Sequence, residues 1–311
     1  MSYAIGINVT TSSDGVAVKI SDDYVWTYHQ SPTNELNRWD KSDGTLLGTI
    51  SLNSTAGQNG MAYAFGSLWI TDNTGTLRRY ATDDTLQASI ASIGDGFCYA
   101  VADGYLWIGS EFPSRVIKVD PSTNTVAGTI ATGFGNRAMT YGAGSIWTTN
   151  RPTGKTTVTR IDTASSTITA TIDTSTSATS NTALVYESGY VLVGVEADDV
   201  IKSINVSTDV IVNTLAATGP SRFSVAFGRS VINDQEDWLL LDATTLSEVD
   251  RIPATLWNPS LLGSTAVDGD ADELWTLLNV AGSGIKLQQI VQLPAPAGGS
   301  SISVGRARAW R

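Results

Sequence analysis

Gly66-Ser67-Leu68-Trp69-Ile70 is the stretch that decides the fold, because its pattern returns along the whole chain. A small or turn-forming residue precedes a short apolar run, and a tryptophan holds a fixed place in that run. Clear copies are Gly104-Tyr105-Leu106-Trp107-Ile108 and Gly144-Ser145-Ile146-Trp147-Thr148. Fainter copies are Asp23-Tyr24-Val25-Trp26-Thr27 and Asp272-Glu273-Leu274-Trp275-Thr276. A pattern that returns at a nearly fixed interval predicts a repeat protein whose units share one structure.

Seven positions mark the units, and two of them carry an aliphatic residue in place of tryptophan. The seven markers are Trp26, Trp69, Trp107, Trp147, Leu192, Val231 and Trp275. They are about 38 to 45 residues apart, which is the period of a four-stranded propeller blade. Because leucine and valine replace tryptophan, we expect the markers to fill the space between neighbouring units, whereas a ligand-stacking role would require an aromatic ring.

The second unit shows the internal order of strands that the other units repeat. Residues 61–65 form a short apolar strand, a turn leads to the marker strand, and residues 77–80 and 86–90 alternate apolar and polar side chains. Alternation with β-branched residues between turn residues is typical of half-buried strands. No convincing helical periodicity interrupts it, so the chain is predicted to be all-β.

We therefore predict one domain over residues 1–293, a seven-bladed β-propeller of four-stranded blades. Such sheets cannot bury both faces alone, and radial stacking leaves only short edges. The seventh unit has strands at 266–269, 274–278 and 286–293 but no fourth. Residues 3–9 are strand-like and precede the first unit, so we expect them to supply it and close the ring. Residues 294–311 read as a Pro/Ala/Gly linker and a basic tail.

Composition restricts the partners and the chemistry. The chain has 311 residues and a formal net charge of −11, which disfavours nucleic acid and anionic membrane surfaces. No apolar stretch is long enough to span a bilayer, and the N-terminus lacks the pattern of a secretory signal. The expected location is a virion or otherwise the cytoplasm. Cys98 is the one cysteine and is expected in the core; His29 is the one histidine.

The segment 119–130, Val-Asp-Pro-Ser-Thr-Asn-Thr-Val-Ala-Gly-Thr-Ile, resembles the YVTN-type β-propeller repeat when it is read with Gly133 and residues 144–150. It is also similar to related propellers that include the virginiamycin B lyases. The resemblance implies a seven-bladed ring with a central channel, a fold that hosts both binders and enzymes. The lyases use a catalytic histidine and a bound magnesium, and His29 does not fall on their histidine motif.

The family's usual binding place is the channel mouth. We expect loops from each fourth strand to the next inner strand, and from each marker strand to the third strand, to meet on one face. Amides with charges of both signs there suit a polar ligand or a partner loop; alternatively, these residues cap turns. The predicted binding residues are Asn59, Asp72, Asn73, Asp95, Glu111, Arg137, Asn150, Arg151, Asn181, Arg222, Asn233 and Asn258.

Two further segments carry weaker signals. Asp268, Asp270 and Asp272 place carboxylates at alternate positions, a spacing that can bind calcium, although a solvated acidic turn explains it equally. No other cofactor is expected. The tail residues Arg306, Arg308, Trp310 and Arg311 are predicted to dock on a partner subunit, because Trp and Arg dominate interface hot spots; the alternative is a frayed terminus.

No recognisable catalytic set is present, which favours a binding or assembly module over an enzyme. Within that class we expect a bacteriophage virion structural protein, at the tail or capsid surface, with a role in host attachment and with other virion subunits as protein partners. Two alternatives stay open. One is a lyase or hydrolase with His29 as general base. The other is a carbohydrate-binding propeller that recognises a host-surface glycan through Tyr28, Phe112, Phe134 and Trp257.

Overall fold

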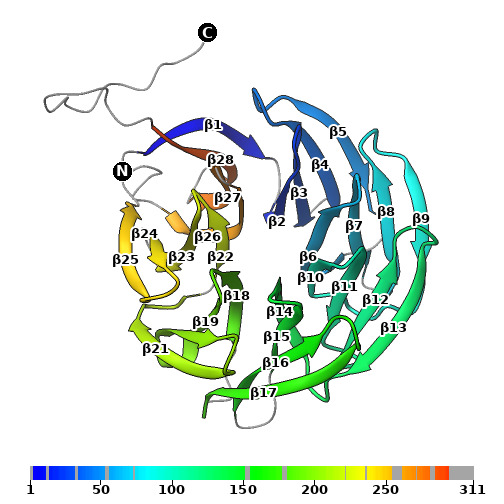
Figure 1. Ribbon diagram of the computed structural model, residues 1–311. Helices are drawn as coiled ribbons and strands as arrows, with labels where there is room; N and C mark the ends of the chain where they lie inside the picture. Colours follow the sequence, from blue (N-terminus) through cyan, green and yellow to red (C-terminus); the bar gives the residue numbers. More distant parts are fainter. Residues whose placement is uncertain are drawn as a thin grey trace, which may run out of the picture.

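Seven antiparallel sheets of four strands surround a common centre, and they follow one another around the ring in sequence order (Figure 1). The computed structural model describes residues 3–11, 14–31, 34–52, 56–72, 74–150, 155–176, 181–220, 222–234, 237–253, 261–270, 272–280 and 284–293. The predicted all-β, seven-bladed propeller is confirmed.

The first four sheets each run from an inner strand to an outer strand in chain order. The first sheet is β2 (Asp14–Ile20), β3 (Tyr24–Ser31), β4 (Glu35–Asp40) and β5 (Leu46–Ser51), and the second is β6 (Ala56–Ala64), β7 (Ser67–Asp72), β8 (Leu77–Ala81) and β9 (Leu86–Ile90). The third is β10 (Cys98–Ala102), β11 (Tyr105–Ser110), β12 (Arg115–Asp120) and β13 (Thr125–Ala131), and the fourth is β14 (Asn136–Gly142), β15 (Ser145–Asn150), β16 (Thr156–Asp162) and β17 (Thr167–Ser175).

The fifth and sixth sheets keep this order, and the seventh takes its outer strand from the other end of the chain. The fifth is β18 (Asn181–Glu187), β19 (Tyr190–Val195), β20 (Val200–Asn205) and β21 (Val210–Ala216), with the 3-10 turn η1 (Glu196–Asp198), and the sixth is β22 (Phe223–Ala226), β23 (Arg229–Asp234), β24 (Asp237–Asp242) and β25 (Ser247–Ile252). The seventh is β26 (Leu261–Gly269), β27 (Glu273–Val280), β28 (Gly284–Gln292) and β1 (Tyr3–Thr11).

The N-terminal strand closes the ring, as predicted. β1 pairs with β28 in antiparallel register, with Tyr3 opposite Gln292 and Thr11 opposite Ile285. Figure 1 shows β1 on the outside of β28, beside the first sheet. A methyl group built on Gly44, in the β4–β5 turn, would lie 2.5 Å from Ile7, so the first sheet packs closely on this strand. The two ends of the described chain therefore share one blade.

The second strand of each sheet is the most buried one, because a neighbouring sheet covers each of its faces. Every residue of β7 and of β15 is buried, and all seven marker side chains have no exposed surface. A strand that is covered on both faces reads as a continuous apolar run. The indole N–H of Trp69, 3.1 Å from the carbonyl oxygen of Ala64, is satisfied within its own sheet.

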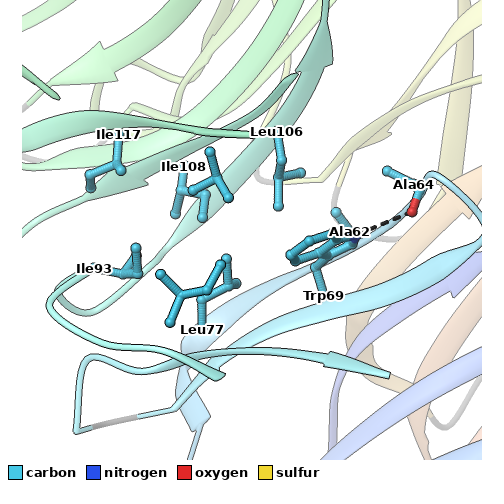
Figure 2. Packing of buried hydrophobic residues seen from close by; sticks show 10 residues of the cluster. Ala62, Ala64, Trp69, Leu77, Ile93, Leu106, Ile108 and Ile117 are labelled. Carbon is cyan, nitrogen blue, oxygen red and sulfur yellow. Dashed lines mark hydrogen bonds between the residues drawn. The ribbon is translucent and has the colours of Figure 1, made fainter. Parts of the chain in front are cut away.

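Figure 2 shows the contact between the second and third sheets. Trp69, Leu77 and Ile93 meet Leu106, Ile108 and Ile117, which come from the next blade. Each fully buried aliphatic or aromatic side chain of this kind contributes about 1.5–3 kcal/mol relative to an exposed one. The ring is therefore held by apolar clusters that lie between the blades.

A cation from the third strand covers each of the first four tryptophans. The guanidinium of Arg79 lies 4.8 Å from the Trp69 ring centre, and Arg160 lies 5.0 Å from that of Trp147. Arg38 and Lys118 cover Trp26 and Trp107 in the same way. In each case the cation pairs directly opposite its tryptophan across the two strands.

The cation is absent where the marker is aliphatic: Ser203 stands opposite Leu192, and Leu240 stands opposite Val231. An aliphatic side chain offers no π face to a cation, but a tryptophan marker does not always carry one, since Gln289 stands opposite Trp275 in the seventh sheet.

The three arginines among these four cations also join their blade to the next one. Arg38 donates two hydrogen bonds of 2.9 Å to Asp84. Arg79 donates to the carbonyl oxygen of Pro121 and to Asn124. Arg160 donates to the carbonyl oxygen of Val206 and to Asp209. The acceptors all lie in the turn between the third and fourth strands of the following sheet, so the same hydrogen-bonded link between blades occurs three times around the ring.

The outer strands carry a β-bulge at a fixed place. In each of the first six sheets the pairing of the third and fourth strands shifts directly after the residue opposite the marker. A bulge twists an edge strand and interrupts its row of hydrogen-bonding groups, which protects it against pairing with another chain. The rim of the ring is therefore poorly suited to strand addition.

Deletion of residues 1–11 should lower the melting temperature by roughly 10 °C or more, because it exposes the edge of β28 and the apolar face that β1 covers. Differential scanning calorimetry measures the change. A synthetic peptide of residues 1–11 added in excess should restore part of the loss. An unchanged melting temperature for the truncated chain contradicts the closure by β1.

Replacement of Arg79 by alanine should destabilise the fold by about 2–3 kcal/mol, because it removes the contact with Trp69 together with charge-assisted hydrogen bonds to the next sheet. Lys118→Ala is the control: it removes a cation from the Trp107 and Tyr105 rings but has no hydrogen bond to the next sheet among the described contacts, so about 1 kcal/mol is expected. Urea unfolding measures the loss of stability in both variants, and equal losses count against a stabilising role of the hydrogen bonds between the blades.

Candidate functional site

One face of the ring carries the loops that join second to third strands and the loops that join consecutive sheets; we call it the loop face. The residues predicted to bind at the channel mouth belong to these loops and to the strand ends beside them. Five of the twelve lie wholly or partly outside the described part of the chain. They are Asn73, Arg151 and Asn258, and the side chains of Asn59 and Asn181.

Asp72 is the last residue of β7 and is buried. Its Oδ1 accepts hydrogen bonds from the backbone N–H groups of Thr74 and Thr76, and its Oδ2 lies 2.9 Å from Arg78. Burial alone would raise the pKa of Asp72, but the hydrogen bonds from Thr74, Thr76 and Arg78 outweigh it and hold the pKa below its usual range. In the described structure this carboxylate therefore organises its own loop.

Asn150 is also buried, at the end of β15, and belongs to a network that joins the third and fourth sheets. Its amide N–H donates to Asn136 Oδ1 at 2.9 Å, and its Oδ1 accepts from Thr159. Asn136 in turn donates to the carbonyl oxygens of Ser110 and Arg115. Asn136 is the first residue of β14, and nothing in the sequence at that position indicates that its amide links two blades.

Arg222 and Asn233 lie together in the sixth sheet. The backbone N–H of Asn233 donates to the carbonyl oxygen of Arg222 at 3.0 Å, and the Asn233 side chain is largely buried. Burial lowers the pKa of Arg222, and the nearby Glu196 opposes this shift. Their predicted binding role stays a prediction.

Asp95, Glu111 and Arg137 do form one cluster, between the third and fourth sheets. Asp95 anchors the loop 111–114: its Oδ1 accepts hydrogen bonds from Ser110 Oγ and from the backbone N–H of Glu111, both at 2.7 Å. Its Oδ2 accepts from the backbone N–H of Phe112 at 3.0 Å. One carboxylate thus fixes three donors at the start of the loop.

Glu111 pairs with Arg137 across the boundary between the sheets, with 2.8 Å between Oε1 and Nη2. The guanidinium of Arg137 also lies 4.6 Å from the ring centre of Phe97. The two charged side chains keep 12% and 27% of their surface exposed. The Phe97 ring therefore packs against the Arg137 side of the ion pair, and both charged side chains stay partly exposed.

The loop 132–135 lies directly on Glu111. A methyl group built on Gly135 would lie 2.5 Å from Glu111 Cγ, so only glycine allows this approach. Thr132 donates its hydroxyl hydrogen to the carbonyl oxygen of Phe134 and accepts a hydrogen bond from Asn136. Both loops of the cluster are therefore tied to the sheets and to each other.

Each loop presents an exposed phenylalanine. Phe112 is 73% exposed and Phe134 is 44% exposed, although both lie in loops held by hydrogen bonds. We call Asp95, Glu111, Phe112, Phe134 and Arg137 the Phe112–Phe134 patch. The expectation that Tyr28 is a surface aromatic is wrong, because Tyr28 is buried within β3. Trp257 lies outside the described residues.

His29, which we expected in the loop after the first marker strand, lies within strand β3 instead. The side chain has no exposed surface, and its Nε2 lies 2.8 Å from Thr27 Oγ1, which also accepts the indole N–H of Trp39. A histidine that is fully covered in this way does not reach a bound substrate. Cys98 is buried as expected, and burial raises the pKa of its thiol to about 12.

Two of the three carboxylates proposed for calcium are engaged by lysines. Asp268 Oδ1 lies 2.9 Å from Lys19 Nζ, and Asp270 Oδ2 lies 3.1 Å from Lys41 Nζ. Within the described ranges, no group of three or more His, Cys, Asp or Glu side chains is placed to hold a metal ion. The calcium site stays a prediction. The tail residues Arg306, Arg308, Trp310 and Arg311 lie outside the described residues.

The Phe112–Phe134 patch can supply apolar ring surface beside a hydrogen-bonding carboxylate and guanidinium. Two acidic and two basic side chains lie in or next to it, since Arg115 follows the loop directly. When Arg115 is counted, the charges in and next to the patch balance, on a chain of net charge −11. In the part of the chain that is described, no helix has the length and apolarity to cross a membrane.

Replacement of Asp95 by alanine should destabilise the protein by about 1–3 kcal/mol, because three donors lose their acceptor at once. Asp173→Ala is the matched control: that carboxylate is exposed and pairs only with an exposed lysine, so a change within about 0.5 kcal/mol is expected. Urea unfolding gives both values. A loss for Asp95→Ala no larger than the control contradicts its anchoring role.

Comparison with known proteins supports the fold and goes no further. No protein-family model matches the sequence, and no curated protein matches it. Among solved structures, hydrazine synthase from Kuenenia stuttgartiensis is similar with a TM-score of 0.73 and 11% identity, over 90% of this chain and 96% of that chain. The computationally designed protein Ika8 is similar with a TM-score of 0.63 and 12% identity, over 90% of this chain and 98% of that one. At these identities the likeness shows a shared propeller architecture.

Proposed function

We propose that the chain is a non-enzymatic binding module that engages its partner through the Phe112–Phe134 patch on the loop face. The observation that carries the proposal is the exposure of two phenylalanines on loops that hydrogen bonds hold in place. An exposed ring on a mobile loop is unremarkable. When a partner covers an exposed ring on a loop that is already held in place, only the side chain has to be ordered and the cost of ordering the loop is small.

The charged side chains around the patch favour binding over catalysis. Asp72 pairs with Arg78, Glu111 pairs with Arg137, and Asp95 is surrounded by donors. General acid–base chemistry requires a group that reaches the substrate and titrates near the working pH. His29, the base that a lyase of the virginiamycin B type would need, is covered on all sides.

Two more specific interpretations, one of the family and one of the biological role, belong to the same proposal. The repeat around residues 119–130 supports membership of the YVTN-type propellers. Attachment to a virion through the basic tail is supported by the Ser/Thr/Gly-rich β surface, the single cysteine and the small number of lysines. Assembly into a bacteriophage tail or capsid surface is the most specific form of the binding role.

The size of the tagged chain in native extract tests the proposal. We expect it to elute with a mass well above its own 32.8 kDa, or to sediment with particulate material. The double variant Phe112→Ala/Phe134→Ala should return it to the position of the single chain, because the apolar anchors are gone. Elution of the wild type at single-chain size in every fraction contradicts the binding role.

Leu86→Ala/Val210→Ala is the matched control for this experiment. Both residues are exposed apolar side chains at the outer rim, away from the loop face, and each is about half exposed. Their removal should leave the complex intact. If the rim variant dissociates the complex and the loop variant does not, the binding surface is at the rim. A particle-sized fraction that contains the wild-type chain supports the virion form.

A further inference from the structure

We infer that the Phe112–Phe134 patch binds a neutral saccharide, with a sugar ring on the phenylalanines and adjacent hydroxyls on Glu111 and Arg137. This inference rests on the binding role proposed above and names the chemical class of the ligand. It follows from three properties of the patch: exposed apolar rings, a carboxylate and a guanidinium side by side, and balanced charge.

The rings supply the apolar half of the site. One face of a pyranose ring carries mainly C–H groups and packs on an aromatic face in the way that other apolar groups do. Phe112 follows Glu111 in one loop, and Phe134 precedes the Gly135 that lies on Glu111 in the other. The Glu111 carboxylate therefore lies where the two loops that carry the rings meet. Because these loops are tied by Asp95 and Thr132, little conformational entropy is lost on binding.

Glu111 and Arg137 supply the polar half. A hydroxyl group both donates and accepts hydrogen bonds, so two adjacent hydroxyls are matched by an acceptor and a donor that lie side by side. Glu111 uses Oε1 for Arg137, and Arg137 uses one of its N–H groups for Glu111. The second carboxylate oxygen and the remaining N–H groups on the two Nη atoms have capacity left for a ligand, whereas Nε of Arg137 is buried. Both side chains are partly exposed, so a ligand can reach them.

The charge balance indicates a neutral ligand. Asp95 and Glu111 are offset by Arg137 in the patch and by Arg115, whose guanidinium donates to the carbonyl oxygen of Ser92 close by. A sialylated, uronic or sulfated saccharide would meet two carboxylates and an overall charge of −11. A cationic ligand would meet two guanidiniums. A ligand without charge avoids both penalties.

The competing occupant is an extended peptide, because the N–H and C=O of one residue lie side by side on the same edge of a strand and also offer a donor beside an acceptor. Binding of a peptide or protein without saccharide is an outcome that overturns the inference.

An array of immobilised oligosaccharides tests it, with the full chain displayed on streptavidin to gain avidity. The probes are neutral oligomers of hexoses, pentoses and N-acetylhexosamines, beside sialylated, uronic and sulfated ones. We expect retention on a subset of the neutral probes and none on the anionic probes. Calorimetric titration with the best neutral oligosaccharide then gives the affinity of the single site.

Three variants locate the site, and their melting temperatures show that the fold is retained. Phe112→Ala should weaken binding tenfold or more. Arg137→Lys keeps the ion pair but removes the planar fork, and Glu111→Gln keeps the shape but removes the charged acceptor; each should weaken binding about tenfold. Leu86→Ala, at the rim, should have no effect.

The outcomes are distinct from those of the extract experiment. The inference is overturned if no neutral probe is retained, if anionic probes are retained equally well, or if all three patch variants bind like the wild type. If the array is empty while the native complex still depends on Phe112 and Phe134, the binding role stands and the partner is a protein.

Discussion

The marker side chain of each second strand, a tryptophan in five of the seven blades, is packed between two sheets, and this contact requires a neighbour on both faces of every blade. A linear row of blades would leave the end faces in water, so the apolar clusters stabilise the fold fully only when the ring closes. β1 meets this requirement: it joins β28 and covers apolar side chains at the seam with the first sheet. The arginines over Trp26, Trp69 and Trp147 add polar links between blades, because one side chain contacts the ring of its own blade and the turn of the next.

The rigidity of this ring decides what the loop face can do. Loops between sheets are short and lead from the exposed outer strand of one blade to the inner strand of the next, and their polar side chains connect the blades. Asn136 shows this clearly, since one amide reaches two carbonyl groups of the third sheet and the side chain of Asn150 in the fourth. Where such links hold both ends of a loop, the loop can keep an apolar side chain in water. Phe112 and Phe134 occupy two loops of this kind, and the ion pair between Glu111 and Arg137 lies where these loops meet.

The sequence predicted the loop face from the repeat alone and placed Asp95, Glu111 and Arg137 on it. It did not predict which of the polar residues would be turned inward. Asp72 and Asn150 have the polar side chain and the place in the repeat that we expect of a binding residue. Both are nevertheless buried at strand ends and satisfy local donors and acceptors. Tyr28 and His29 come shortly after the first marker, but β3 extends through both residues and their side chains are buried. Strand length beyond the marker depends on hydrogen bonds with β2 and β4, which no local pattern records.

The sequence by itself determined the number of blades, the order of strands in each blade and the need for an added strand at the seam. These follow from a period, an alternation and a count, all of which are local in the chain. Only the tertiary structure decided the pairs that cross from one blade to another: Arg79 with Asn124, Glu111 with Arg137, and Asp95 with the loop of Phe112. The physical reason is that such contacts depend on the angle and spacing between two sheets. That geometry is set by side-chain packing, in which residues from separate repeats fill one space, and it has no signature within a single repeat.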